Sequence, residues 1–234
     1  MKLKNSLDLA VRMSRYNLKI VFANKFVYFL LAAFVFFLGI TAIIFFSSDS
    51  DPDASDVYNL LLFPGILLVF YPTAFGIQND VDSRMIEILF GIPNYRYKVW
   101  LLRLALIWLI VIVFLAVLAL LSSAALVPVP IAKMVYQLMF PIFFLGCLSF
   151  MFSTLIRSGN GTAVVMVAIG MAFWISSGII AQSRWNLFLN PFGDHSNQVI
   201  WAATILKNRI YLAVGSILAL LYGLMNLQKR EKFI

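Results

Sequence analysis

Six apolar runs, each about as long as a membrane-spanning helix, limit what this 234-residue chain can fold into. The hydrocarbon core of a bilayer is about 30 Å thick, and roughly 20 residues of α-helix cross it. Because hydrocarbon offers no partner to an unpaired backbone group, an apolar run in lipid is expected to be helical. The predicted spans are Phe26–Phe46, Tyr58–Gln78, Val99–Leu121, Val135–Ile156, Thr162–Ala181 and Ile210–Leu227.

The composition favours a membrane protein over a soluble one. Hydrophobic residues make up 62% of the chain and charged residues 12%, and the mean hydropathy is +0.94. Soluble domains carry about 25% charged residues, so this chain has too few polar groups to cover a water-facing surface. The sequence also lacks the short alternating segments of a β-barrel and any internal repeat. We therefore predict one all-α integral membrane domain over residues 1–234, with six transmembrane helices.

The distribution of basic residues predicts the orientation of the spans. Most of the eighteen Lys and Arg residues fall before the first span, between the second and third spans, or after the last. Residues 47–57 contain aspartates but no Lys or Arg, so the positive-inside rule places both termini in the cytoplasm. Arg184, Lys207 and Arg209 are exceptions in the last outer loop. The net charge of +8 is then a topology signal, and nucleic-acid binding is not expected because no basic patch is interleaved with exposed aromatics.

Residues 5–24 are amphipathic and are expected to form a helix in the plane of the membrane interface. Arg12, Arg15 and Lys19 lie on its polar face, where they would meet lipid headgroups. One interpretation is an anchor that only orients the first span. The other is an elbow helix that transmits an ATP-driven rearrangement along the membrane. No apolar core of a cleavable signal is present in this stretch, so none is expected.

The loop between the second and third spans has the most specific pattern. Residues 82–91 predict a short helix, with capping residues at its start and a Gly and a Pro at its end. Its apolar side chains either dock into a groove of a partner or pack back under the bundle. The candidate contact residues of this loop are Asp82, Arg84, Ile86, Glu87, Leu89, Phe90, Pro93 and Arg96.

This loop resembles one in the permease subunits of type-2 ATP-binding-cassette exporters. The resemblance is carried by Glu-Ile-Leu at 87–89, by Pro93 and Arg96, and by the run LNPFGD at 189–194 before the last span. Six spans, cytoplasmic termini and an N-terminal elbow helix also match. The resemblance implies that residues 82–91 form a coupling helix that inserts into a cytoplasmic ATPase.

The same resemblance implies that the outer loop, residues 182–209, holds short helices that help to close the exit. The expected outer gate residues are Asn190, Pro191, Phe192 and Gly193. The alternative for this segment is a surface helix with a belt of aromatic residues at the membrane boundary.

Several motifs are missing from the sequence. Without a GxxxxGK[ST] loop, the chain is not expected to be an enzyme, and ATP and Mg would be bound by separate P-loop ATPase subunits. The single His195 is interpreted as a solvated loop residue and the single Cys147 as a packing residue, so no metal site or cofactor is expected. No charged residue lies near the middle of a predicted span, which argues against a secondary transporter.

Proline and small residues within the spans leave two questions open. Pro64 and Pro72 in the second span and Pro141 in the fourth mark either hinges or ordinary packing irregularities. Gly170 and Gly178 in the fifth span allow close helix contact, either within the chain or in a dimer.

Together these features predict the permease subunit of an ATP-driven exporter in a bacterial cytoplasmic (inner) membrane. A second permease copy or a paralogue would complete the pathway, two ATPase subunits would bind beneath it, and lipid would surround it. The apolar spans favour a lipidic or amphipathic cargo. The main alternative is a six-span scaffold or assembly component without transport activity, and a secondary transporter is the third.

Overall fold

The structure, a computed structural model, describes residues 26–46, 52–82, 96–193 and 197–227. Within these ranges there is no β-strand, and six helices are long and apolar enough to cross a membrane. The elements are α2 (Phe26–Phe46), α3 (Ala54–Asp82), the π-helical turn η1 (Arg96–Leu101), α5 (Leu102–Ala125), α6 (Ile131–Ile156), α7 (Gly159–Ile179) and α8 (Gln198–Asn226). The prediction of six membrane-length helices is confirmed, and the chain has the architecture of a multi-pass membrane protein.

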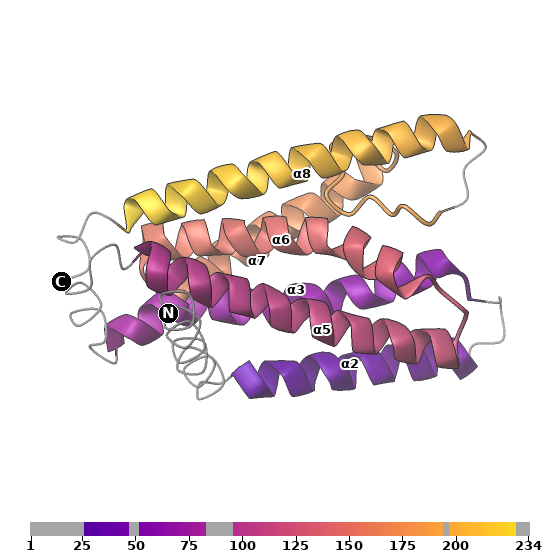
Figure 1. Cartoon of the computed structure of the whole chain (residues 1–234), viewed down its shortest axis with the longest axis horizontal. Coiled ribbons are helices and arrows are strands. Elements are labelled where there is room, and N and C mark those ends of the chain that lie inside the picture. The colour runs from indigo at the N-terminus through magenta and orange to yellow at the C-terminus, as the bar shows by residue number, and fades with distance from the viewer. Residues whose placement is uncertain (1–25, 47–51, 83–95, 194–196, 228–234) are drawn as a thin grey trace, which may run out of the picture.

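The helices run up and down along the long axis of the molecule, with α3 and α6 at the centre (Figure 1). Helix α3 contacts α2, α5, α6 and α7, and α6 also contacts α8. In the most apolar stretch of α3, 67% of the residues are buried, against 11% in α2 and in α7. The peripheral helices therefore present most of their apolar side chains outward, as expected for contact with lipid.

The two ends of the bundle differ in the segments that they contain. The loop end, at the right of Figure 1, is where α3, α6 and α8 begin and where residues 180–193 lie. At the opposite end α2 begins and α8 ends, so the start of the first described helix and the end of the last lie on the same side of the bundle.

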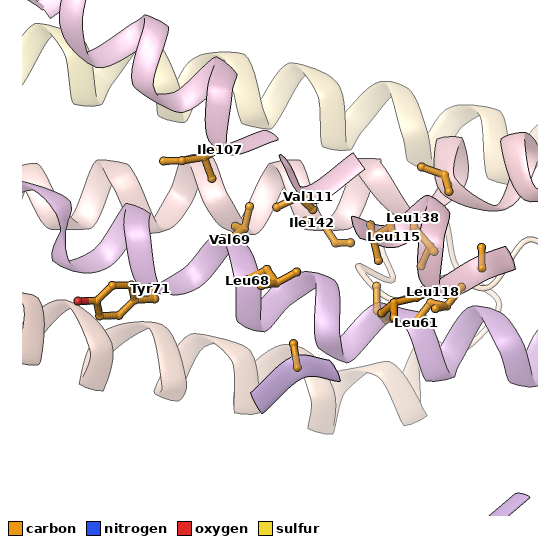
Figure 2. Close-up of a cluster of buried hydrophobic side chains, with 14 of the residues drawn as sticks. Leu61, Leu68, Val69, Tyr71, Ile107, Val111, Leu115, Leu118, Leu138 and Ile142 are labelled. Atoms are coloured by element: carbon orange, nitrogen blue, oxygen red, sulfur yellow. The ribbon is translucent and has the colours of Figure 1, made fainter. Parts of the chain in front are cut away.

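The core lies where α3, α5 and α6 meet. Figure 2 shows Leu61, Leu68 and Val69 of α3 gathered with Leu115 of α5 and Ile142 of α6, and all five are buried. These side chains are branched and apolar, so they fill the space between helices without leaving polar groups unpaired.

Small residues bring the central helices together. A Cβ atom at Gly146 of α6 would lie 2.6 Å from Val69 Cγ1 of α3, and one at Gly223 of α8 would lie 2.9 Å from the Phe150 ring of α6. Real Cβ contacts are longer, so glycine is required for this approach of α6 to its two neighbours.

The glycines of the fifth span behave differently. A Cβ atom at Gly170 or Gly178 would meet no described atom within 4 Å. Contact of these two residues with another helix of the chain is therefore not observed, and a dimer remains the alternative for this face of α7.

Helix α8 departs from the sequence-based expectation. It begins at Gln198, twelve residues before the predicted span at Ile210, and its first turns take up much of the expected outer loop. Asn197 caps the helix by accepting a hydrogen bond from the Ile200 backbone N–H at 3.2 Å. Polar residues lower the mean hydropathy of the first turns of α8, but they do not disturb the backbone hydrogen bonds. The helix therefore continues through them. Residues 180–193 form successive turns, so the helical part of the expected outer loop is the first twelve residues of α8, 198–209.

Candidate functional site

A buried arginine organises the loop end of the bundle. Arg209 of α8 is 4% exposed, and its guanidinium donates hydrogen bonds to side chains from α3, α6 and α8. The acceptors are Gln137 Oε1 at 2.8 Å, Asn208 Oδ1 at 2.9 Å and Tyr58 Oη at 3.3 Å. A fourth bond, at 3.2 Å, reaches the backbone oxygen of Leu189. We call these five residues the Arg209 cluster.

The positions of Tyr58 and Gln137 along their helices show how far Arg209 lies inside the bundle. Tyr58 lies four residues into α3 and Gln137 six residues into α6, which places Arg209 about 6–9 Å below the starts of those helices. Arg209 was expected in the outer loop, but the early start of α8 places it inside the bundle. No carboxylate of the described residues pairs with it. A buried charge within membrane helices is costly, which makes Arg209 a candidate functional residue.

The cluster fastens the irregular segment 180–193 to the helices. Asn208 donates from Nδ2 to the carbonyls of Arg184 at 2.8 Å and Asn186 at 2.9 Å. Asn186 in turn donates to the Ala181 carbonyl at 3.1 Å. Leu187 and Leu189 of the segment are 2% and 1% exposed. Non-helical backbone at membrane depth is tolerated where protein supplies its hydrogen bonds, and the cluster supplies several of them.

The expected outer gate residues lie directly beyond this point. Asn190 Nδ2 donates to Ser55 Oγ at 2.8 Å and to Asn59 Oδ1 at 3.2 Å, both on the first turns of α3. Asn190 Oδ1 accepts from the Phe192 backbone N–H at 2.9 Å, which shapes the turn through Pro191 and Gly193. The Phe192 ring packs 5.9 Å from the Tyr58 ring. The structure thus brings this segment into contact with α3 and with the Arg209 cluster.

An apolar cavity of about 700 Å³ adjoins the segment. It lies along α3, between α2 and α7, and Phe188 contributes to its wall at the loop end. Phe188 also makes an edge-to-face contact with Trp174 of α7, at 6.2 Å between ring centroids. Arg209 binds the backbone of Leu189, and the preceding residue, Phe188, forms part of the cavity wall. The cluster is therefore one residue away from the cavity.

An ion pair is buried at the opposite end. Arg103 Nη1 of α5 donates to Asp80 Oδ2 of α3 at 2.9 Å, both residues are nearly inaccessible, and the guanidinium lies 4.6 Å from the centre of the Trp100 ring. Arg103 falls near the start of the predicted third span, and it lies in the first turn of α5. This pair joins α3 and α5 beside the two ends of the chain segment that contains the expected coupling helix.

The remaining predicted site residues fall largely outside the described part of the chain. Asp82 ends α3, is exposed, and accepts a hydrogen bond from Gln78 Nε2 at 3.3 Å, and the backbone of Arg96 begins η1. The predicted residues that lie outside the described ranges are Arg12, Arg15, Lys19, Arg84, Ile86, Glu87, Leu89, Phe90 and Pro93. The elbow and coupling assignments therefore stay predictions.

Sequence reasoning missed the Arg209 cluster and the Asp80–Arg103 pair. For the pair a signal existed, because opposite charges stood just inside the facing ends of two consecutive helices. For Arg209 the only signal was the pair Asn208-Arg209 directly before an apolar run. Comparison with protein-family models, with curated proteins and with solved structures finds no match for this chain.

Proposed function

We propose that this chain is the membrane-spanning permease subunit of an ATP-driven ATP-binding-cassette exporter. The observation that carries the proposal is the cavity along α3, which lies within the apolar helices and adjoins the Arg209-held segment at one end. A path for a substrate needs both a space between the spans and an element able to close it; the cavity is the candidate for the first and residues 180–193 are the candidate for the second.

The position of the charges favours this function over ion-coupled transport. Proton- and ion-coupled transporters place titratable carboxylates near the middle of the membrane. Among the described residues, Asp80 lies two residues from the end of α3 and is paired with Arg103, while Arg209 lies toward the loop end with neutral acceptors. Energy would instead come from two cytoplasmic P-loop ATPase subunits, which the chain contacts through residues 82–91.

A second permease copy or a paralogue would complete the pathway. Only 11% of the most apolar stretch of α7 is buried, so the outward side chains of this helix are available to another chain. ATP binding would close the ATPase dimer, move the coupling segment and shift the population of bundle conformations. The chain would lie in a bacterial cytoplasmic membrane with both termini inside.

The test is purification of the tagged protein from its native host in a mild detergent, with mass spectrometry of co-eluting proteins. We expect a P-loop ATPase that is lost in Phe90→Asp and retained in Asn94→Asp, a control change in the same loop outside the predicted contact set. Glu87→Ala should keep membrane insertion but uncouple ATP hydrolysis from export. Recovery of the chain without an ATPase in several mild detergents would refute the proposal and favour the scaffold alternative.

A further inference from the structure

The cavity along α3 has the shape of an elongated apolar groove. Its α3 lining extends from Asp56 to Phe70, which at 1.5 Å per residue is about 21 Å. Its walls carry aromatic rings from three helices and from the 180–193 segment. These rings belong to Phe36, Phe63, Phe70, Trp174 and Phe188. Such a groove fits a chain-like or aromatic apolar body.

Polar groups line this cavity only at the loop end. They are Asp56 and Asn59, one helical turn apart on α3, and no Lys, Arg or His of the described residues lines the cavity. The Asn59 amide oxygen accepts a hydrogen bond from Asn190. The formal charge of the cavity wall is therefore that of the Asp56 carboxylate.

The Asp56 carboxylate has no positive partner in the described part of the chain. Its Oδ2 accepts a hydrogen bond from the Asp53 backbone N–H at 3.1 Å, and the side chain is exposed at the cavity mouth. Asp53 Oδ1 in turn accepts a hydrogen bond from the Asp56 backbone N–H at 2.8 Å, so the two residues cap the start of α3, where the helix dipole also favours a carboxylate. A carboxylate at the boundary of an apolar groove also complements a positive charge, and the aromatic rings of the groove add cation–π attraction for a cation that lies over them.

We infer that the cavity binds a cationic amphiphile, with its apolar part along α3 and its positive group beside Asp56. On the proposed function, this would be the class of molecule that the exporter transports. An anionic amphiphile would place its charge against Asp56 and the nearby Asp53, and a neutral alcohol would gain at most a hydrogen bond and no attraction between opposite charges.

The direct test measures binding to the chain alone, in nanodiscs of a zwitterionic lipid. The probes are radiolabelled dodecyltrimethylammonium, dodecanol and dodecyl sulfate, which share one tail length and differ in charge, with empty discs subtracted. We expect the cation to bind tightest and the anion weakest. Equal binding of all three would overturn the inference, because it would mean that any alkyl chain, including that of a lipid, fills the groove.

Two matched pairs of variants locate the site. Asp56→Asn keeps the hydrogen-bond acceptor for Asp53 but should lower cation affinity on the order of fivefold, while Asp53→Asn, outside the lining, should have a smaller effect. Gly170→Leu should weaken binding of the cation and of dodecanol, because Gly170 lines the cavity and its Cβ position is open. Gly178→Leu makes the same change on the same helix outside the lining and should leave binding intact.

Equal effects within either pair would overturn the inference. Because no ATPase takes part in this assay, its result is independent of the proposed function. Selective cation binding without a co-purifying ATPase would keep the site and refute the exporter, and an ATPase partner with unselective binding would do the reverse.

Discussion

Replacing Arg209 by Met should loosen the attachment of residues 180–193 at Leu189, while the bonds made by Asn208 and Asn190 remain. The guanidinium makes four hydrogen bonds, to Gln137, Asn208, Tyr58 and the Leu189 carbonyl. Methionine has a similar length and keeps the packing of the apolar stem, but it donates to none of these groups. The Leu189 carbonyl would keep only the long 3.5 Å bond from Tyr58 Oη.

The size of the effect follows from two opposing contributions. Each hydrogen bond to a charged group contributes about 1.5–3 kcal/mol. Removing the buried charge also removes its desolvation cost of several kcal/mol, which offsets part of that loss. Only the bond to the Leu189 carbonyl joins the guanidinium directly to the segment. We therefore expect a net cost of about 1.5–3 kcal/mol there, which corresponds to a roughly ten- to hundredfold larger undocked population.

Hydrogen–deuterium exchange with mass spectrometry measures this population. Peptides covering residues 183–193 should exchange up to about a hundredfold faster in Arg209→Met, while peptides of α3 and α6 beyond the first two turns stay protected. Arg209→Lys should give an intermediate rate, since an ammonium group reaches fewer acceptors. The control is Arg184→Met, which removes the same charge from an exposed position of the same segment. Equal exchange of residues 183–193 in Arg209→Met and Arg184→Met would refute the assigned role of the cluster.

Two further predictions concern helix packing. Asp80→Asn or Arg103→Met should each destabilise the protein by about 3–5 kcal/mol, because either removes one partner of a buried ion pair. A double-mutant cycle by thermal unfolding in detergent should show strong coupling, and additive effects would contradict a direct pair. Gly146→Ala should cost about 1–2 kcal/mol, since the clash with Val69 exceeds the gain in helix propensity, whereas Gly178→Ala should not lower the melting temperature. Equal melting temperatures of the two alanine variants would show that α3 and α6 are not held together at Gly146.

The positions of the helices were largely predictable from the sequence. Within the described residues, the predicted and observed starts and ends of the second to fifth spans differ by a few residues. A lipid environment explains this accuracy, because each span must satisfy its own backbone hydrogen bonds and cover itself with apolar side chains. Both requirements act within one continuous stretch of about 20 residues. The start of α8 was missed because an apolar window cannot detect a helix that continues through Lys207, Asn208 and Arg209.

The candidate site depended on the tertiary structure. Arg209 and Tyr58 are 151 positions apart, and Asn190 and Ser55 are 135 apart. Their contacts exist only because α3, α6 and α8 pack side by side at the loop end. The cavity likewise depends on how far α2 and α7 stand from α3, which no single span encodes. Local hydropathy therefore determined which segments are membrane helices, while the long-range packing of those helices decided which polar groups are buried together and where space is left between them.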